Sequence, residues 1–431
     1  MGTSSTRESG VGVTEVELDV TNVAHGGVFV ARHDGRVVFV GDTLPGERVR
    51  ARITDDGHKS FWRAETVEVL EAAPERRPHV WSEASVDRAP SERAGGAEFG
   101  HIRLEHQREL KRQVLADALQ RMAGVETDVT VEAVAPPAGA TGVAEADGTC
   151  WRTRVRLQVA DDGSIGPYAS RTHRVVDVGS LPLATVRIGE VAPLTRRFPG
   201  AAHVDVIAPS ADSARVLVVE RDGKGRPKPA RHGVIHETVA GRTFRLETGG
   251  FWQVHARAAE TLYHAVQDMI DEGDFDPRAS NLDLYGGVGL LAVAVGDRFG
   301  ETVRITTVES DARATEHATE NLAEWIGANA LTDRVDRYLQ HVTREAGAAE
   351  RRSFEAATVV LDPPRAGAGR AVVDRLAAVG PRQLVYVACD PVALARDVGL
   401  LREHGYELRE LRAFDLFPNT HHLEAVARLT R

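Results

Sequence analysis

The sequence is poor in cysteine and has no long apolar run. Two of its 431 residues are cysteine, Cys150 and Cys389. They are too few for a disulfide framework, a four-cysteine zinc site or an iron–sulfur cluster with four cysteine ligands, and they favour a reducing compartment, the cytoplasm. No apolar run approaches the roughly 18 residues of a transmembrane helix, and the N-terminus has no apolar core, so neither a membrane span nor a secretion signal is expected.

Charge is unevenly distributed along the chain, although its net value is −10. The numbers of basic and acidic side chains are 17 and 25 in residues 1–149, 17 and 10 in residues 150–257, and 19 and 28 in residues 258–431. The net charge argues against nucleic acid, but one basic segment in an acidic protein indicates a surface for a polyanion. A solvated basic face is the alternative interpretation.

The period of the apolar residues divides the first part of the chain in two. Up to about residue 75 the pattern is all-β: Val16, Leu18 and Val20 alternate with acidic residues, and Asp34-Gly35 between two apolar runs predicts a hairpin. This length suits a barrel of about five short strands. In residues 76–255 we expect a helix over 101–122, a loop over 131–149 and mostly β-structure over 150–250.

Helix and strand alternate from residue 256 to the end, which predicts a doubly wound α/β domain. The expected strands cover residues 281–285, 303–309, 358–362, 383–388, 406–414 and 423–429. In open α/β folds the ligand binds at the carboxyl ends of the parallel strands. Residues that follow these strands are therefore the first candidates for a functional site.

The first of these strands runs into three glycines. In Asn281-Leu-Asp-Leu-Tyr-Gly-Gly-Val-Gly-Leu290 the glycines allow a sharp turn and let a ligand approach a helix N-terminus. Glu309 ends the next strand, 20 residues after Gly289, where a carboxylate can bind a ribose diol. The spacing is not GxGxxG, so a dinucleotide is not implied. A tight turn with a solvated glutamate is the alternative.

Three further candidates end or open strands. Asp362 precedes two prolines, which end strand pairing and stiffen the loop. Cys389 stands before a helix, whose N-terminus can lower the thiol pKa and favour a nucleophilic thiolate. Glu424 opens an apolar strand, where a carboxylate is either a rim charge or a buried base of raised pKa. His421 and His422 have no third ligand at suitable spacing, so no metal site is expected.

Arginines alternate at the start of the basic segment. Arg152, Arg154 and Arg156 fall on one face of a predicted strand, while Val155 and Leu157 fall on the other. This arginine face is the candidate contact with a polyanion.

Taken together, these motifs resemble the RNA uracil-C5 methyltransferase family. The resemblance rests on residues 281–290, on Asp362-Pro-Pro-Arg365, on Tyr386-Val-Ala-Cys-Asp-Pro391 and on His421-His-Leu-Glu424. Gly249-Gly-Phe-Trp-Gln253 is similar to the phenylalanine–glutamine motif of that family. The N-terminal region resembles a TRAM domain, so the resemblance covers nearly the whole chain.

The resemblance implies a multidomain α/β protein that methylates carbon 5 of a uridine in structured rRNA or tRNA, with S-adenosylmethionine as cofactor. Its parts would be an OB-like TRAM β-barrel (residues 1–75), a central α+β domain (76–255) and a Rossmann-like class I methyltransferase domain (256–431). Cys389 matches the nucleophile of the family and Glu424 its base. The family's cofactor positions correspond to Gln253, Tyr285, Glu309 and Asp362. Arg152, Arg154 and Arg156 are the expected RNA contacts.

The chain departs from related enzymes in three places. Leu290 follows the glycine turn where some members carry a polar residue, and the third cofactor motif, near Gln340-His341, lacks the usual acid. Many of these enzymes carry cluster-binding cysteines after the barrel, whereas residues 81–101 contain none, so neither an iron–sulfur cluster nor a metal is expected. We expect a monomer without membrane contact. Two alternatives remain: an RNA cytosine-C5 methyltransferase, which uses the same thiolate chemistry, and a non-catalytic RNA-binding protein, against which the presence of both Cys389 and Glu424 argues.

Overall fold

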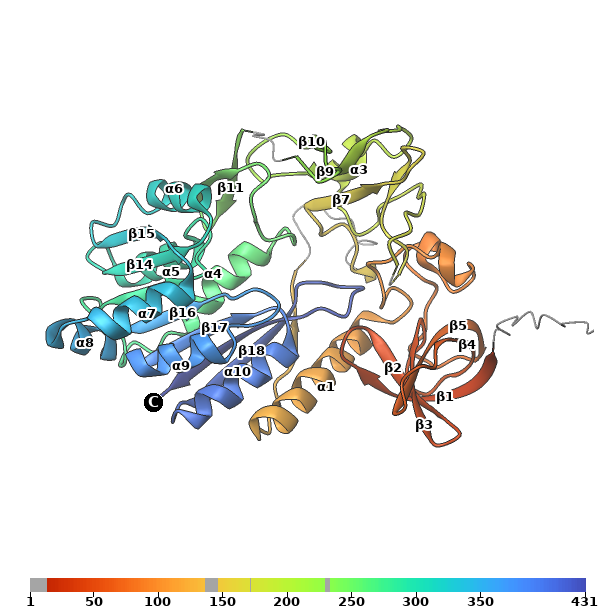
Figure 1. The fold of residues 1–431 in the computed structure, drawn as a ribbon, viewed down its shortest axis with the longest axis horizontal. Helices are drawn as coiled ribbons and strands as arrows, with labels where there is room; N and C mark the ends of the chain where they lie inside the picture. Colours follow the sequence, from red (N-terminus) through yellow and green to blue (C-terminus); the bar gives the residue numbers. More distant parts are fainter. Residues whose placement is uncertain (1–13, 136–145, 171, 229–232) are drawn as a thin grey trace, which may run out of the picture.

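The N-terminal region is the predicted barrel. The computed structural model describes residues 14–135, 146–170, 172–228 and 233–431 (Figure 1). Among these, five strands close into a barrel in the order β1-β2-β3-β5-β4. Their bounds are Glu15–Ala24 (β1), Val28–His33 (β2), Arg36–Gly41 (β3), Arg48–Asp55 (β4) and Phe61–Glu71 (β5). The alternating residues Leu18 and Val20 are buried in the barrel core, and the β2–β3 hairpin turns at Asp34-Gly35, as the sequence predicted.

The middle of the chain forms smaller elements. Helix α1 (Leu104–Ala123) ends at Gly124, which has a φ of +61°. Glycine adopts this left-handed conformation easily because it has no Cβ atom. A sheet in the order β10-β9-β7-β8 and a β11–β12 hairpin follow. The remaining bounds are Ser82–Ala84 (η1), Pro90–Glu92 (η2), Arg154–Val159 (β7), Ile165–Gly166 (β8), Val186–Val191 (α3), Ala201–Ile207 (β9), Arg215–Glu220 (β10), Val234–Val239 (β11) and Arg242–Glu247 (β12).

The C-terminal region is built on a mixed sheet, which in the described residues has the order β15-β14-β13-β16-β17-β19-β18-β6. Strand β19 runs antiparallel to both of its neighbours, whereas the other pairs in the described part of this sheet are parallel. The bounds are Val131–Ala133 (β6), Asn281–Leu284 (β13), Ile305–Glu309 (β14), Ala328–Thr332 (β15), Thr358–Leu361 (β16), Gln383–Ala388 (β17), Glu407–Asp415 (β18) and Glu424–Thr430 (β19).

Helices cover both faces of this sheet, as expected for a doubly wound fold. Helices α4 (Ala258–Met269), α5 (Leu290–Phe299) and α6 (Ala312–Asn321) contribute to one apolar core. Helices α7 (Val335–Glu345), α8 (Ala348–Glu355), α9 (Arg370–Val379) and α10 (Pro391–Glu403) contribute to the other, together with α1. Figure 1 shows α1 beside α10, between the sheet and the barrel.

The sequence analysis predicted six of the eight strands of the C-terminal sheet, each to within two residues, and missed the other two. All six strands expected after residue 256 are present. Strand β15 was not predicted, and β6 lies at the start of the predicted 131–149 loop. Although β6 and α1 come from the segment between residues 76 and 255, they pack into the C-terminal unit, because β6 pairs with β18 and α1 covers the end of the sheet.

A buried ion pair joins α1 to this sheet. Lys111 Nζ is 2.6 Å from Asp415 Oδ1 and 3.0 Å from the Phe417 carbonyl oxygen, and the two charged side chains are 0% and 2% exposed. Burial lowers the pKa of Lys111, and Asp415 opposes this shift. The pair therefore ties α1 to the loop that leads into β19.

Lys111→Met is expected to lower the free energy of unfolding by about 3 kcal/mol, because it leaves the Asp415 carboxylate buried and unpaired. Equilibrium unfolding in urea measures this loss. The pair Arg121–Asp117 on the same helix is exposed, so Arg121→Met is the control and should change the value by less than about 0.5 kcal/mol. Similar losses in both variants would contradict the interpretation.

Candidate active site

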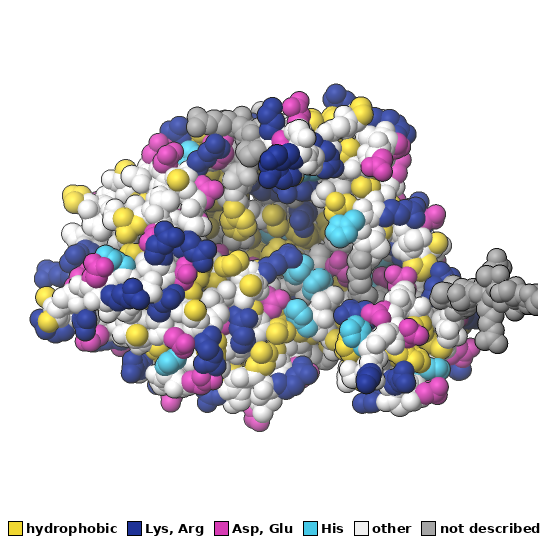
Figure 2. All heavy atoms as spheres, in the orientation of Figure 1, with side chains coloured by type: hydrophobic (Ala, Val, Ile, Leu, Met, Phe, Trp, Pro, Cys, Tyr) yellow, Lys and Arg dark blue, Asp and Glu magenta, His cyan; other side chains and the backbone are white. Residues whose placement is uncertain are grey.

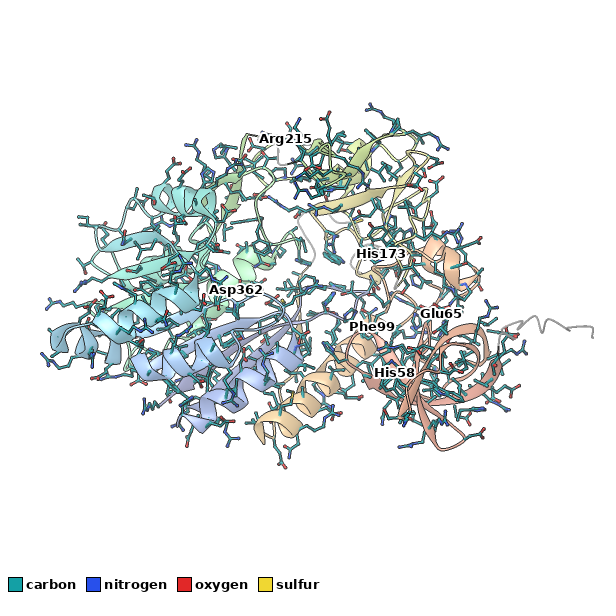
Figure 3. All side chains as sticks on the ribbon, in the orientation of Figure 1. His58, Glu65, Phe99, His173, Arg215 and Asp362 are labelled. Atoms are coloured by element: carbon teal, nitrogen blue, oxygen red, sulfur yellow. The ribbon has the colours of Figure 1, made fainter. Side chains whose placement is uncertain are left out.

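The structure brings Cys389 and Glu424 together at the carboxyl edge of the sheet. Strands β17 and β19 are antiparallel, with Ala388 opposite Ala425, so Cys389 and Glu424 are the next residues on the two adjoining strands. On the other side of β17, Leu361 pairs with Tyr386 in parallel register. Asp362 therefore lies at the same edge, and Figure 3 shows it in the central part of the molecule.

The glycine turn lies at the same edge, after β13. Tyr285 has a φ of +62°, and its backbone N–H and that of Gly286 both donate to the Val308 carbonyl. A Cβ at Gly286 would lie 1.9 Å from Thr307 Oγ1, whereas one at Gly287 would meet nothing within 4 Å. Only glycine fits at residue 286, and the turn leaves open space beside residue 287, where a ligand can approach the backbone.

The carboxylate of Glu309 lies across from this turn at the end of β14. Its Oε2 accepts a hydrogen bond from the Gly287 N–H at 3.2 Å, and its Oε1 accepts from Ser310 Oγ and the Asp311 N–H. These bonds fix the carboxylate beside the open turn. A fixed carboxylate in this position is suited to accept hydrogen bonds from a pair of ribose hydroxyls.

A further acidic residue at this edge, Asp283, was missed by the sequence analysis. It lies within β13 and is fully buried, and its Oδ2 accepts from Thr307 Oγ1 at 3.0 Å while its Oδ1 has no hydrogen-bond partner in the described residues. Burial raises the pKa of Asp283 to about 7. The available signal was a lone carboxylate inside an apolar strand, where an acid is rarely buried without a partner or a function.

The catalytic candidates influence one another through their charges. Burial and the neighbouring Asp283 raise the pKa of Asp362 to about 7. Burial and Asp362 raise the pKa of Glu424 well above its ordinary value, while Arg365 lowers it. Glu424 is 3% exposed. Of the two possibilities for this residue, the structure supports the buried carboxyl of raised pKa.

The pKa of Cys389 is shifted in the direction opposite to the prediction. Burial, followed by the nearby carboxylates of Glu424 and Asp362, raises the pKa of the Cys389 thiol to about 12. The N-terminus of α10 does not offset this, because Asp390 is the group that caps it: the Asp390 carboxylate accepts from the N–H groups of Val392 and Ala393. The prediction that the helix lowers this pKa is therefore wrong.

Gln253 lies in a segment that accepts hydrogen bonds from Thr153 and Arg154, at the start of β7. The Thr153 N–H and hydroxyl both donate to the Val254 carbonyl, and Arg154 Nη1 donates to the Gly250 carbonyl at 2.7 Å. Gln253 is half-buried, and within the described residues its amide makes no hydrogen bond. Its amide group is thus available to a ligand.

The three predicted arginines have different surroundings. Arg154 is largely buried and lies 4.0 Å from Glu237, whereas Arg156 is 57% exposed and forms a bidentate pair with Asp205. Arg152 is half-buried, and burial, followed by the positive charge of Arg365, lowers its pKa. Of the three, Arg156 alone presents most of its side chain to solvent, and contact of all three with RNA stays a prediction.

The loop between β18 and β19 is fixed by the middle of the chain. Asn419, with a φ of +66°, accepts from Arg77 and Gln107 and donates to the carbonyls of Asp147 and Gly148. His421 and His422 belong to this loop, and no group of three or more potential metal ligands occurs in the described ranges. The loop therefore holds the start of β19, and with it Glu424, in place.

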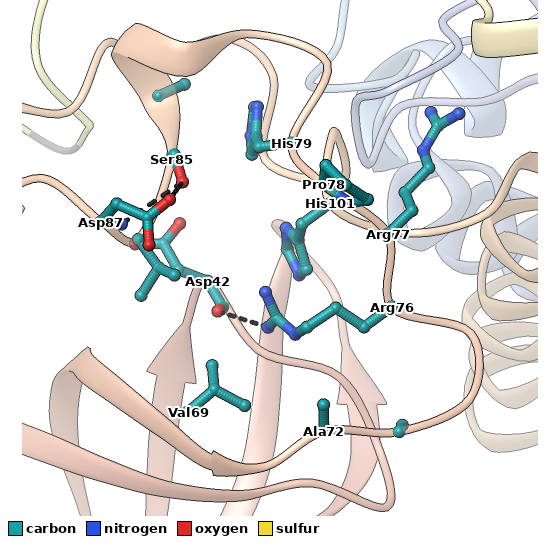
Figure 4. Close-up of a pocket in the computed structure, with 13 residues that line it drawn as sticks. Asp42, Val69, Ala72, Arg76, Arg77, Pro78, His79, Ser85, Asp87 and His101 are labelled. Carbon is teal, nitrogen blue, oxygen red and sulfur yellow. Dashed lines mark hydrogen bonds between the residues drawn. The ribbon is translucent and has the colours of Figure 1, made fainter.

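A cavity of about 450 Å³ lies between the barrel and the segment that follows it (Figure 4). Its lining includes Asp42, Arg76, Arg77, His79 and His101. The Arg76 guanidinium pairs with Glu47 and donates to the Asp42 carbonyl, and burial lowers the pKa of His79 to about 4. None of the predicted site residues lines this cavity. It is therefore separate from the carboxyl edge of the sheet, which we call the catalytic edge because the catalytic candidates Cys389 and Glu424 lie there.

The face of the molecule that Figure 2 shows is hollowed near its centre. Figure 2 shows this hollow between the sheet that contains β7, β9 and β10, at the top of the view, and the C-terminal domain. Lys and Arg side chains lie at its upper border. Figure 3 labels Arg215 on strand β10 of that sheet. In the described part of the chain, no helix has the length and apolarity needed to cross a membrane.

Comparison with known proteins identifies the family. Residues 231–431 match the model of the tRNA (uracil-5-)-methyltransferase family, and residues 12–61 match the TRAM domain. An uncharacterized RNA methyltransferase of Streptomyces avermitilis is 38% identical over 96% of this chain and 97% of its own length. A 23S rRNA (uracil(1939)-C(5))-methyltransferase of Alkalilimnicola ehrlichii is 30% identical over 95% of each chain.

A solved structure supports the same assignment of fold. The tRNA (uracil-54, C5)-methyltransferase of Pyrococcus abyssi, solved with S-adenosyl-L-homocysteine, superposes with a TM-score of 0.66 over 96% of this chain and 99% of its own, at 21% identity. At this identity the likeness shows a shared fold. The barrel at residues 15–71 is thus a TRAM domain, and the chain belongs to the family of S-adenosylmethionine-dependent RNA uracil-C5 methyltransferases.

Proposed function

We propose that this protein transfers a methyl group from S-adenosylmethionine to carbon 5 of a uridine in rRNA or tRNA, through a covalent bond between Cys389 and the base. One observation carries the proposal: Cys389 directly follows strand β17, and Glu424 opens the paired strand β19 beside it, since Ala388 pairs with Ala425. The reaction needs a thiolate that adds to a ring and a base that later removes a proton from the neighbouring ring carbon. Two paired strands hold these groups at a fixed separation.

The chemistry assigns one step to each residue. Carbon 5 of uracil is a poor nucleophile. When the Cys389 thiolate forms a bond to carbon 6, the C5=C6 electron pair moves toward the carbon-4 carbonyl oxygen, and carbon 5 becomes nucleophilic. After carbon 5 is methylated, Glu424 takes its proton. The electrons of that C–H bond restore C5=C6, the S–C6 bond breaks, and the thiolate leaves.

Two observations support the assignment of a cofactor site. Glu309 and the open turn at Gly287 are suited to a ribose and the adjoining chain, and Gln253 has an amide without a partner in the described residues. We assign Gln253, Tyr285, Glu309 and Asp362 to the binding of S-adenosylmethionine. When bound, this cofactor supplies an electrophilic methyl group on a positively charged sulfur.

RNA would bind across the hollow between the basic middle segment and the C-terminal domain, and the TRAM barrel would provide a further contact. A uridine inside a helix cannot reach Cys389, so the target base must leave its stack at a cost of a few kcal/mol. This cost is smallest for a loop nucleotide, and we therefore propose a loop uridine in structured RNA as the substrate.

The proposal is tested by mapping modified nucleosides with and without the gene. Ribosomal and transfer RNA are separated, digested and analysed by mass spectrometry, and we expect 5-methyluridine to disappear from one position in one fraction. Loss of 5-methylcytidine instead would establish the cytosine-C5 alternative. Unchanged nucleosides in both fractions would contradict methylation of rRNA or tRNA.

Arg154 and Arg156 provide a matched pair of variants on one strand. Arg154→Met should weaken binding of S-adenosylmethionine, because the Gly250 turn before Gln253 loses its hydrogen bond. Arg156→Met should leave cofactor binding unchanged but reduce the slope of log K for RNA against log salt by about 1, the effect of one lost phosphate contact. Calorimetry and filter binding measure the two quantities. The reverse pattern would show that the two roles are assigned wrongly.

A further inference from the structure

The turn between strands β1 and β2 of the TRAM barrel lies against the catalytic edge. His25 Nε2 is 2.8 Å from Asp390 Oδ2. Gly27 has a φ of +72°, and a Cβ there would lie 2.9 Å from His421 Nδ1. Because Asp390 follows Cys389 and His421 precedes Glu424 by three residues, a single turn of the barrel contacts both loops that carry the proposed catalytic residues.

We propose that His25 is a positioning residue for Cys389: as an imidazolium it neutralises Asp390 and thereby favours the Cys389 thiolate. This inference rests on the proposed role of Cys389 as the nucleophile. It makes the barrel a participant in the chemistry, in addition to a surface for RNA.

Asp390 is shared between two structural roles. Its Oδ1 caps helix α10 by accepting from the N–H groups of Val392 and Ala393, while its Oδ2 faces His25. The hydrogen bond to Asp390 raises the pKa of His25. Burial alone would raise the pKa of Asp390, but hydrogen bonds from His25 and Ala393 hold it below its ordinary value. The pair therefore favours the charged form of both residues.

The charges around Cys389 show why this pair matters. Burial raises the pKa of Cys389 most, and three carboxylates on three elements raise it further: Glu424 on β19, Asp362 after β16 and, with the smallest effect, Asp390 at the start of α10. Arg365 opposes them. His25 does not act on the thiol directly. Its positive charge reduces the effect of Asp390, which is the carboxylate next to Cys389 in the chain.

The inference is tested on the full-length protein without RNA, by measuring the rate at which iodoacetamide alkylates Cys389. A Cys150→Ser background removes the second thiol. At pH 6.5 we expect His25→Gln to slow alkylation about twofold to fivefold, the range for a partly exposed ion pair. His25 is positively charged below its pKa, which the contact with Asp390 raises. The difference in alkylation rate between the parent and His25→Gln should therefore be present at low pH and vanish as the pH rises through the pKa of His25.

Further variants separate the effect of charge from that of shape. His25→Lys keeps a positive charge and should alkylate like the parent at pH 6.5. Asp390→Ser keeps a good helix cap but removes the carboxylate, so that adding His25→Gln to it should change nothing. His33→Gln, at the other end of strand β2, is the matched control and should have no effect.

Two results would overturn the inference. One is a rate ratio between the parent and His25→Gln that does not change with pH, which would indicate a steric role. The other is an undiminished effect of His25→Gln in the Asp390→Ser background. Because no RNA is present, the assay is independent of the proposed function: a protein that shows the expected alkylation pattern but makes no 5-methyluridine would overturn that function and support the electrostatic coupling.

Discussion

Cys389→Ala is expected to abolish methylation of RNA in a protein that still folds and binds S-adenosylmethionine. Without a nucleophile at carbon 6, carbon 5 of the uracil has no means of accepting a methyl group. We expect the rate of transfer to fall by more than about 100-fold, as for other residues that form a covalent intermediate. Incorporation of labelled methyl groups into RNA measures the rate, and calorimetry measures the affinity for the cofactor.

Cys150→Ala is the control for this variant. Cys150 lies in the middle segment, where its backbone N–H donates to the Pro182 carbonyl, and it has no place in the proposed chemistry. Its replacement should leave transfer close to that of the parent. Residual transfer of Cys389→Ala above about 1% of the parent would assign the nucleophile to another residue.

The order of elements at the catalytic edge was predictable from the sequence because the central strands β16 and β17 of this sheet are buried on both faces. Strand β17 has six buried residues in succession, and a continuous apolar run that stops at Cys389 marks both the strand and its end. The same holds for β16 and Asp362. Since parallel strands present their carboxyl ends to one edge, knowing where two strands end is enough to place Cys389 and Asp362 together.

The missed strands lack this signal. Strand β15 lies at the edge of the sheet, and none of its five residues is buried, so the apolar pattern that marks the other strands is absent. Strand β6 has three residues and pairs with β18, which lies about 280 positions later in the chain. Pairing at this distance leaves no local pattern, so it is visible only in the folded chain.

The environment of the site residues was less predictable than their positions. A local rule assigned the N-terminus of α10 to Cys389, but the structure assigns it to Asp390 and surrounds the thiol with carboxylates. The contact between His25 and Asp390 joins residues 365 positions apart. Electrostatic effects depend on all neighbours in space, so the residue that follows Cys389 in sequence was not enough to fix the direction of its pKa shift.

Glu424→Gln is expected to separate methyl transfer from release of the enzyme. The substitution keeps the shape of the buried side chain but removes its ability to take a proton. Methylated carbon 5 then retains its hydrogen, C5=C6 cannot reform, and Cys389 stays bonded to carbon 6. The RNA should remain attached to the protein, whereas the parent releases it.

Denaturing gel electrophoresis after incubation with RNA and methyl-labelled cofactor distinguishes the two variants. We expect a labelled band at the summed mass of protein and RNA for Glu424→Gln, and little for the parent or for the exposed control Glu407→Gln, which lies on the neighbouring strand β18. Adding Cys389→Ala to Glu424→Gln should remove the band, since the bond can no longer form. If Glu424→Gln instead releases methylated RNA at the parent rate, the proton is taken by another group, and Asp362 is the next candidate because it lies at the same edge, and its charge acts on both Glu424 and Cys389.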